Sequence, residues 1–441
     1  MPFPLKFPGG VHPHEGVHGK EATRHKPTVV AQVPDRVILP LSQHIGAACE
    51  CLLQKGDTVA LGQPIGCAKG RVSAPVHASV SGRVVDIAPC MLVNGISVPS
   101  VVIDNDHEDR WDPSIRPDPD VETRTPEELV DRIRGAGIVG LGGATFPTAV
   151  KLSIPEGKSV DTLILNGAEC EPYLTADHRL MLERPDEVLD GLALGMKILS
   201  VQKAFIGIED NKPDALELLR SKAPANVQVV SLPTRYPQGG EKQLIYALTG
   251  RRVPKGGLPM DVGVVVLNVA TAAAISRSLR TGRPLIERII TVAGRVANPQ
   301  NLLVRIGTPL NTLVEQCGGL TEGVEKLVLG GPMMGIALSR LEIPMVKSYS
   351  GLLALGKESI APEENPCIRC GRCAEACPML LPPMRMDAFI RKRMCAEAEK
   401  EGLFSCIECG ACSYVCPAKR QLAQMFRVGK YMLYQERKKK A

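Results

Sequence analysis

The chain has 441 residues, of which 44% are hydrophobic and 3% aromatic, with 15 cysteines and a formal net charge of +6. This length predicts about three domains, and the apolar content is sufficient for buried cores. The longest apolar run, residues 262–275, is too short to span a bilayer. The opening residues, MPFPLKFPGGVHPHEG, lack the apolar core of a signal peptide, so we expect a chain that stays in the cytoplasm. The scarcity of aromatic residues argues against a stacking surface for nucleic acid.

Residues 1 to about 110 predict β structure, because short runs rich in β-branched residues alternate with Gly and Pro. The runs 28–30, 36–39 and 82–87 are examples. The opening stretch also holds four histidines: His12, His14, His18 and His25. Since no cysteine pairs lie nearby, a polar Gly/Pro-rich loop is favoured over a zinc site.

A Pro- and Asp-rich linker over 110–124 ends at Thr125-Pro126-Glu127-Glu128, which is a capping box with proline at the first helical position. The glycine-rich segment 140–151, GLGGATFPTAVK, follows and enters another helix. Glycines let backbone N–H groups approach a phosphate closely, and Pro147 can begin a helix whose positive end favours an anion. Lys151 adds a positive charge. Because glycine-rich turns are common, the loop indicates a phosphate site only together with the secondary structure around it.

The segments after this loop alternate between strands and helices. We expect strands over 160–165, 204–209, 227–232 and 262–268, and helices over 213–222 and 270–279. This alternation predicts a mostly parallel, Rossmann-like sheet, whose ligands lie at the carboxyl ends of the strands. The glycine-rich loop falls at that edge together with four polar residues: Asn166, Glu169, Glu171 and Asn268. The arrangement predicts a nucleotide or flavin site.

Short strands return after this region, over 289–296, 304–306 and 326–329, with a helix near 310–316. They predict a small α+β unit, closed by the segment GGPMMG at 330–335. We expect the two methionines of that segment to pack rather than to contact a cofactor.

Two cysteine runs of the form C-x2-C-x2-C-x3-C-P lie near the end of the chain. In bacterial ferredoxins with two [4Fe-4S] clusters, the fourth cysteine of each run binds the cluster of the other run. One cluster is therefore predicted on Cys367, Cys370, Cys373 and Cys416, and the other on Cys406, Cys409, Cys412 and Cys377. A pair of structural zinc sites is the alternative, but zinc does not require the x3-C-P element. Two adjacent clusters predict an electron-transfer path.

The last stretch is basic. From Pro417 to Ala441 there are eight Lys or Arg residues and one acidic residue. This charge favours contact with an anionic membrane surface or an acidic protein partner. A solvated tail without a partner is the alternative.

Taken in order, these motifs resemble the C subunits of the Rnf complexes, the ion-translocating ferredoxin:NAD oxidoreductases of bacterial membranes. The opening segment 7–13, FPGGVHP, the glycine-rich loop, the GGPMMG segment and both cysteine runs carry the resemblance. It implies a multidomain α/β and β fold with four parts: a barrel-sandwich hybrid over 1–110, an FMN/NADH-binding α/β domain over 125–285, a small β-grasp (SLBB) domain over 286–345 and a helical ferredoxin-like domain over 355–441. The first part also resembles biotinyl and lipoyl carriers, but Lys69 lacks their usual flanking residues, so we expect a scaffold rather than a swinging arm.

The middle region also resembles the flavin- and NADH-binding subunit of respiratory complex I. Where that family reads GRGGAGFPTGLK, NADESEP and NVET, this chain reads GLGGATFPTAVK, NGAECEP and NVAT. Leu141, Thr145 and Ala168 depart from the family pattern, and one extra residue follows Tyr236 in the Tyr…Gly-Glu segment. The resemblance implies non-covalent FMN with NADH stacked over it, bound by Gly140, Gly142, Gly143, Phe146, Lys151, Asn166, Glu169, Glu171, Tyr236, Glu241, Asn268 and Thr271.

The resemblance implies an NAD-linked flavin and iron–sulfur oxidoreductase subunit that passes electrons between NAD(H), FMN and two [4Fe-4S] clusters. Lys151 and the loop amides would hold the FMN phosphate, and Glu169 and Glu171 would orient the nicotinamide or ribose. The implied partners are other Rnf subunits, especially the ferredoxin-like and integral membrane subunits, with peripheral contact at the cytoplasmic face of the cell membrane and no nucleic acid. Two alternatives stay open: a flavin and iron–sulfur protein like cobalamin reductase, and a non-enzymatic iron–sulfur relay or adaptor.

Overall fold

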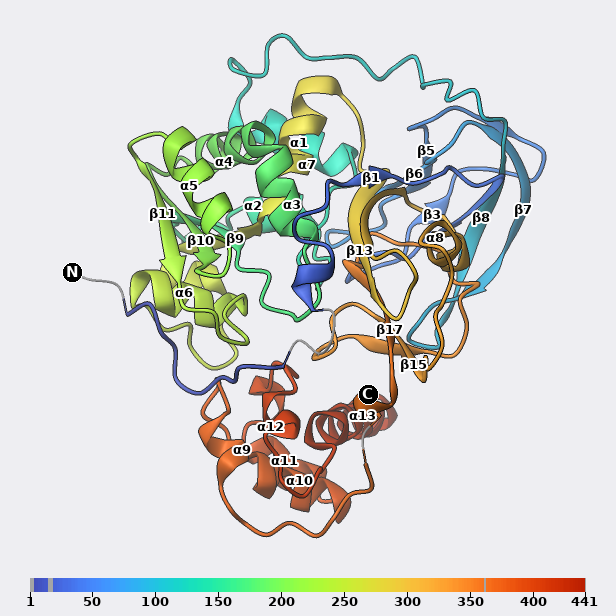
Figure 1. Ribbon diagram of the computed structural model, residues 1–441. Helices are drawn as coiled ribbons and strands as arrows, with labels where there is room; N and C mark the ends of the chain where they lie inside the picture. The colour runs from blue at the N-terminus through green and yellow to red at the C-terminus, as the bar shows by residue number, and fades with distance from the viewer. Residues whose placement is uncertain (1–3, 15–18, 361, 441) are drawn as a thin grey trace.

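The computed structural model describes residues 4–14, 19–360 and 362–440, so His18 lies outside the described residues. Three units that contain β-sheets lie together, and a helical C-terminal unit lies below them (Figure 1). Residues 4–14 follow the boundary between the α/β unit and the C-terminal helices (Figure 1). Val11 forms an antiparallel bridge with Tyr236, and the Gly10 amide donates to the Ala376 carbonyl at 2.9 Å. The opening stretch therefore connects two units that are far apart in the sequence.

The N-terminal unit contains two small sheets. The first has the order β2-β8-β7-β4, with β2 at Arg36–Pro40, β8 at Ser97–Asn105, β7 at Gly82–Met91 and β4 at Thr58–Val59. The second has the order β3-β5-β6, with β3 at Glu50–Cys51, β5 at Pro64–Cys67 and β6 at Val76–His77. Alternate residues of a strand point to one face, and here Val37, Leu39, Val101 and Ile103 are buried. The predicted β structure is present, and Lys69 lies in the connection between β5 and β6.

The second unit is built on a four-stranded sheet in which every neighbouring pair is parallel. Its order is β11-β10-β9-β12, at Val227–Leu232, Lys203–Glu209, Thr162–Gly167 and Val264–Asn268. The predicted Rossmann-like arrangement is confirmed. Ile164 and Phe205 face α6 (Glu241–Thr249), while Leu163 and Ile206 face the larger core on the other side. The helices of that side are α1 at Pro126–Gly135, α2 at Thr148–Leu152, α3 at Ala176–Glu183, α4 at Pro185–Leu199, α5 at Pro213–Lys222 and α7 at Val269–Thr281.

The capping box predicted for α1 is present. The Glu128 amide donates to Thr125 Oγ1 at 3.3 Å, and the Thr125 amide donates to Glu128 Oε2 at 2.8 Å. These bonds satisfy two N–H groups that a helix start otherwise leaves unpaired. The helix ends at Gly135, two residues before Gly137.

The third unit is a six-stranded mixed sheet with the order β1-β14-β13-β17-β15-β16. Its strands are Val29–Val30, Gln300–Arg305, Glu287–Gly294, Gly351–Leu355, Lys326–Leu329 and Ile336–Leu338, and α8 (Leu310–Gln316) packs on it. Two of these strands lie outside the range expected for the unit. β1 pairs in parallel with β14, although it precedes the barrel-sandwich strands in sequence, and β17 pairs with both β13 and β15.

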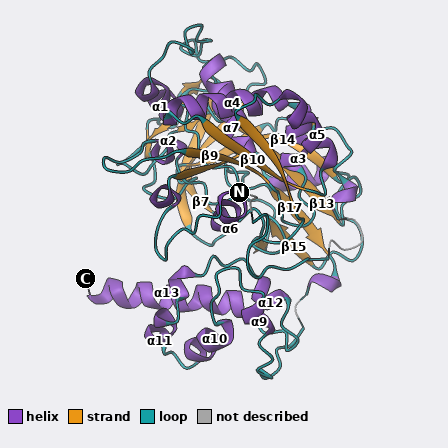
Figure 2. Cartoon of the chain, turned by 90° about the vertical axis from the view of Figure 1, so that its left-hand side faces the viewer, coloured by secondary structure: helices purple, strands orange, loops and turns teal. Residues whose placement is uncertain are grey.

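The C-terminal unit is helical. It contains α9 at Arg372–Glu375, α10 at Pro383–Arg391, α11 at Cys395–Lys400, α12 at Ala411–Tyr414 and α13 at Leu422–Lys440. The long helix α13 runs along the other helices (Figure 2), and its Phe426 and Leu433 are buried against Met386 and Ile390. Much of the predicted basic tail is therefore a packed helix. Of the helices described, none is both long and apolar enough to cross a membrane.

Candidate functional site

The glycine-rich loop lies at the carboxyl edge of the parallel sheet, beside the start of α7. The Leu141 amide donates to Thr271 Oγ1 at 2.9 Å, and Arg288 donates to the Leu141 carbonyl at 3.2 Å. The Gly140 amide donates to the Phe146 carbonyl at 2.9 Å, which closes the loop. Both ends of the loop are thus fixed, while residues 142–144 are exposed.

Two glycines make this loop a cradle. A Cβ on Gly142 would lie 3.1 Å from the Asn268 Cβ, so a side chain there would fill the space between the loop and Asn268. Gly143 has a φ of +139°, and a Cβ there would meet no atom within 4 Å. The first glycine leaves room between two segments, and the second allows a backbone conformation that side chains rarely adopt.

Asn268 and Thr271 belong to the start of α7. Asn268 Oδ1 accepts from the Ala270 amide at 2.8 Å and caps the helix, while its Nδ2 donates to Asp177 Oδ2 at 2.6 Å. Burial raises the pKa of Asp177 to about 7, and the nearby Glu169 carboxylate contributes to the same shift. The N-terminal end of this 13-residue helix, which carries partial positive charge, therefore lies directly beside the loop.

Lys151 extends from α2 toward the sheet. Its Nζ donates to Glu241 Oε1 at 2.8 Å and to the Val266 carbonyl at 3.0 Å. An ammonium group has three N–H donors, so one remains for another acceptor. Glu241, the first residue of α6, fixes the position of this charge.

The segment that follows β9 is held in place by hydrogen bonds from polar side chains. Asn166 Nδ2 donates to the Gly239 carbonyl at 2.8 Å, and Asn166 Oδ1 accepts from the Ala168 amide at 3.2 Å. Two buried lysines donate hydrogen bonds to backbone carbonyls of the same segment. Lys20 Nζ donates to the carbonyls of Glu169, Glu171 and Leu174, and Lys212 Nζ donates to the Ala168 carbonyl at 2.7 Å.

The carboxylates of Glu169 and Glu171 accept hydrogen bonds from backbone amides. Glu169 accepts from Asp177 and His178 at the start of α3, at 2.7 and 3.2 Å. Glu171 accepts from the amides of Met333 and Met334, at 3.0 and 2.9 Å. Burial raises the pKa of Glu171 to about 7, although these two amides oppose the shift. Glu171 thereby connects the GGPMMG turn of the third unit to the segment that follows β9.

Each set of four cysteines predicted to share a cluster surrounds one small cavity. Cys367, Cys370, Cys373 and Cys416 line one of them. Cys377, Cys406, Cys409 and Cys412 line the other. Of the first set, Cys367 and Cys370 are exposed, whereas in the second set Cys377, Cys409 and Cys412 are buried. We call these the exposed cysteine cavity and the buried cysteine cavity.

The buried cysteine cavity lies against several other parts of the chain. The Tyr236 hydroxyl, on a side chain that is fully buried, donates to the Cys409 carbonyl at 2.7 Å. A Cβ on Gly410 would lie 2.9 Å from the Met333 carbonyl oxygen, so the GGPMMG turn lies against this cysteine run. A Cβ on Gly9 would lie 2.7 Å from the carbonyl carbon of Cys377.

The predicted flavin residues thus gather at one edge of the sheet, with one exception. Tyr236 lies between this edge and the cysteines and uses its hydroxyl on Cys409. The cradle at Gly142, the helix start at Asn268 and the free donor of Lys151 fit a phosphate-bearing group such as FMN.

The sequence reasoning missed Lys20 and Lys212. Lys20 lies in a short 3-10 helix at Lys20–Ala22, far from the sheet in sequence, so no local pattern could reveal it. Lys212 precedes Pro213 at the carboxyl end of β10, and that place in a parallel sheet is the signal that could have found it.

Comparison with known proteins agrees with these observations. The chain matches the RnfC barrel sandwich hybrid domain over residues 5–108, the Nuo51 FMN-binding domain over 133–277, the SLBB domain over 289–337 and the 4Fe-4S dicluster domain over 360–417. The predicted fold class, FMN and [4Fe-4S] cofactors are therefore confirmed, and the zinc alternative is not supported.

Three curated relatives, each the C subunit of its complex, cover nearly the whole chain. The relative from the Na(+)-translocating ferredoxin:NAD(+) oxidoreductase complex of Acetobacterium woodii is 49% identical over 98% of this chain and 98% of its own length. The relative from the proton-translocating ferredoxin:NAD(+) oxidoreductase complex of Clostridium ljungdahlii is 50% identical, over 96% of this chain and 92% of its own. The relative from the ion-translocating oxidoreductase complex of Rhodobacter capsulatus is 43% identical, over 98% and 84%. The chain therefore belongs to the family of the C subunits of ion-translocating ferredoxin:NAD(+) oxidoreductase complexes.

Proposed function

We propose that this chain binds FMN and NAD(H) at the carboxyl edge of its parallel sheet and conducts electrons from there through two [4Fe-4S] clusters to an outside partner. The observation that carries this proposal is the hydrogen bond from Tyr236 to the Cys409 carbonyl, because it joins the flavin-binding domain directly to a cluster cysteine. Electron transfer needs such a close approach between cofactor sites.

In this proposal the chain's residues position the flavin. Lys151, oriented by Glu241, and the backbone amides of the exposed residues 142–144 hold the phosphate. Asn166 and Asn268 fix the two segments that border the cradle. When bound, FMN exchanges a hydride with NAD(H) and single electrons with the clusters.

We assign Glu169 and Glu171 a positioning role. Contact of either carboxylate with the nicotinamide or ribose would compete with the backbone amides that now donate to it. Losing two such bonds in a half-buried place costs about 1–3 kcal/mol for each group left unpaired. Glu169 instead holds the segment after β9 against the start of α3, and Glu171 holds the same segment against the GGPMMG turn.

The cluster order follows from burial. The cluster on Cys377, Cys406, Cys409 and Cys412 is the one next to the flavin, because its cavity touches Tyr236, Gly9 and Met333. The cluster of the exposed cysteine cavity is the exit, because Cys367 and Cys370 are exposed and Ile368 between them is 68% exposed. An exposed apolar residue beside a cluster suits a protein partner.

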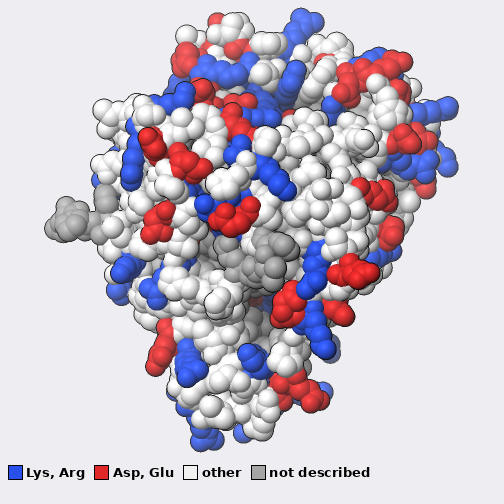
Figure 3. Space-filling view, viewed as in Figure 1, with Lys and Arg blue, Asp and Glu red and all other residues white. Residues whose placement is uncertain are grey.

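We further propose that this exit meets the ferredoxin-like subunit, while integral membrane subunits hold the chain at the cytoplasmic face. Figure 3 shows acidic and basic side chains interspersed over one face of the chain.

The first test is anaerobic purification, followed by extraction of flavin and iron and addition of NADH under a visible spectrum. We expect about one FMN and about eight irons per chain, since two cubanes hold eight, and bleaching by NADH. Iron without flavin and without bleaching would favour the relay alternative. The Cys370→Ser and Cys409→Ser variants test the order: the first should keep the flavin-to-cluster step and lose transfer to the partner, and the second should lose both.

A further inference from the structure

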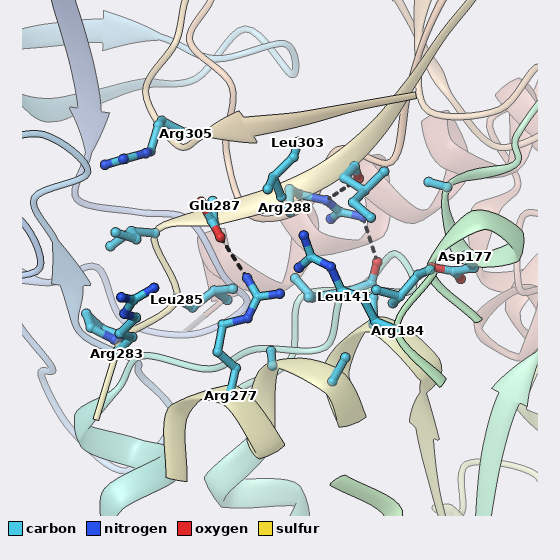
Figure 4. A pocket seen from close by; sticks show the side chains of 18 of the residues that line it. Leu141, Asp177, Arg184, Arg277, Arg283, Leu285, Glu287, Arg288, Leu303 and Arg305 are labelled. Carbon is cyan, nitrogen blue, oxygen red and sulfur yellow. Dashed lines mark hydrogen bonds and ion pairs between the residues drawn. The ribbon is translucent and has the colours of Figure 1, made fainter. Parts of the chain in front are cut away.

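A cavity of about 130 Å³ lies beside Leu141 of the glycine-rich loop, where the α/β unit meets the six-stranded sheet. About 10–15 Å³ suffices for one water, so this space can hold a small organic anion. Five arginines line it: Arg184, Arg277, Arg283, Arg288 and Arg305. In Figure 4 the side chain of Arg184 extends toward those of Arg277 and Arg288. We call this the arginine cavity.

The protein compensates only part of this positive charge. Arg277 pairs with Glu287 at 2.7 Å and with Glu187 at 3.0 Å, and Arg305 pairs with Asp109 at 2.7 Å. Each of these three carboxylates is committed to a guanidinium on the cavity wall.

Arg288 is buried and makes no ion pair with a carboxylate among the described residues. It donates instead to the carbonyls of Lys347, Ile289 and Leu141. Burial lowers its pKa to about 10, and the nearby Asp177 opposes this shift, so Arg288 remains charged at neutral pH.

Arg184 and Arg283 are also left without a bonded carboxylate. Within the part of the chain that the structure describes, the guanidinium of Arg184 makes no hydrogen bond or ion pair. Burial raises the pKa of Glu187, and the nearby charge of Arg184 opposes that shift. Arg283 covers the Trp111 ring at 4.6 Å. Neighbouring guanidiniums repel one another in such a place unless an anion lies between them.

Two carboxylates also line the cavity, Glu287, which pairs with Arg277, and Asp177, which accepts from Asn268 Nδ2, and the other lining residues are apolar. Ala270, Ala273 and Ala274 of α7 form a flat wall of small side chains, and Trp111 lies at another side. An inorganic anion would use the arginines alone. A ligand with an organic part would use both surfaces.

We propose that the arginine cavity binds a small phosphorylated metabolite, with its phosphate between Arg184 and Arg288 and its organic part on the alanines of α7. Guanidinium groups bind phosphate through paired, charge-assisted hydrogen bonds, which suits the free donors of Arg184. The site is separate from the flavin cradle, because the Leu141 backbone lies between them: its amide bonds Thr271 and its carbonyl bonds Arg288.

The same backbone connects the two sites. Arg288 holds the flavin loop through Leu141, so a phosphate that attracts Arg288 changes how firmly this loop is held. We therefore expect the metabolite to change the affinity of the chain for FMN without competing for the FMN site. Ligands that act on one site through another shift binding by a coupling free energy that acts in both directions.

The experiment uses the full chain loaded with FMN and measures binding of AMP by calorimetry, with adenosine as the probe that lacks phosphate. AMP should bind and adenosine should not. Arg184→Gln should weaken AMP binding about tenfold or more, which corresponds to about 1.4 kcal/mol, and Arg283→Gln should weaken it less. Arg220→Gln, on the exposed face of α5, is the matched control for loss of one positive charge and should leave the affinity unchanged.

Three results would overturn the proposal: no saturable AMP binding, equal affinity in Arg184→Gln and the control, or stoichiometric, competitive displacement of FMN by AMP. The last would mean that the cavity is part of the flavin site. If Arg184→Gln does not fold, Arg283→Gln carries the test, because its side chain is exposed. Failure of FMN or NADH binding in the unmodified chain would contradict the proposed function instead, and is measured before AMP is added.

Discussion

The attachment of the cluster unit can be tested at Gly9. This glycine has a φ of +71°, and a Cβ on it would lie 2.7 Å from both the carbonyl carbon and oxygen of Cys377 and 2.9 Å from the Ala376 carbonyl oxygen. Those atoms are backbone and cannot rotate away as a side chain could. Gly9→Ala therefore forces residues 9–11 away from the cysteine run.

The expected cost has two parts. An alanine with positive φ costs about 1–2 kcal/mol. Moving the segment also weakens the bond from the Gly10 amide to the Ala376 carbonyl, now 2.9 Å, and a buried backbone bond contributes about 0.5–1.5 kcal/mol. Gly70→Ala is the matched control, because Gly70 has a φ of +82° and open space where its Cβ would stand. The control carries the first cost alone.

The assay follows the visible absorbance of the clusters during anaerobic urea titration, with iron counted per chain. Gly9→Ala should lower the urea midpoint for cluster loss by more than Gly70→Ala, and the iron lost first should be about four per chain, one cubane. Equal shifts for the two variants would refute the reasoning, since the contact with Cys377 would then contribute nothing.

Three further changes are expected to act at named bonds. Tyr236→Phe leaves the Cys409 carbonyl without its donor and should destabilise the cluster unit by about 1–3 kcal/mol in urea titration. Gly142→Val should weaken FMN binding at least about tenfold in a fluorescence titration, because its side chain fills the space beside Asn268. The pKa of Glu171 is raised from 4.5 to about 7, so protonation favours the folded state; this contribution is complete below pH 4.5 and is lost as the pH rises through 7. The urea midpoint of the unmodified chain should therefore fall between pH 4.5 and 7, and in Glu171→Gln it should fall less over the same range.

The first two of these changes have a control variant in the chain, and the third has an outcome that would contradict it. Tyr434→Phe alters a tyrosine that is 59% exposed and should leave the urea midpoint unchanged. Gly135→Val adds a side chain where no atom lies within 4 Å, so FMN affinity should stay as it was. A Glu171→Gln protein whose stability declines with pH as steeply as the unmodified chain would show that another group causes the decline.

Local signals predicted most of the α/β unit. The capping box at Thr125 placed the start of α1, and the runs of β-branched residues placed all four strands of the parallel sheet. These features depend on residues a few positions apart, and sequence displays such relations directly. The helices α3 and α4, between β9 and β10, were not predicted individually.

Long-range pairing was not predictable in this way. β1 joins the six-stranded sheet beside β14, about 270 residues later, because Val29 and Val30 pair with Leu302 and Leu303. Nothing within β1 distinguishes a strand of the barrel unit from one of the third unit. The same holds for Lys20, whose three acceptors lie about 150 residues away.

The cysteine spacing and the carboxylates show where sequence reasoning about the site succeeds and where it stops. The ferredoxin spacing predicts which four cysteines lie together, and each set surrounds one cavity. The loop before each short helix, α9 or α12, carries two members of a set and the helix carries the third, while the fourth follows the other short helix. Glu171 could be placed at the strand edge, but its acceptance from Met333 and Met334 depends on a turn of another unit. That turn also lies against Gly410 in the buried cysteine cavity. One carboxylate thus links the flavin loop, the third unit and the cluster next to the flavin, so a change at Glu171 should disturb cluster retention as well as flavin binding.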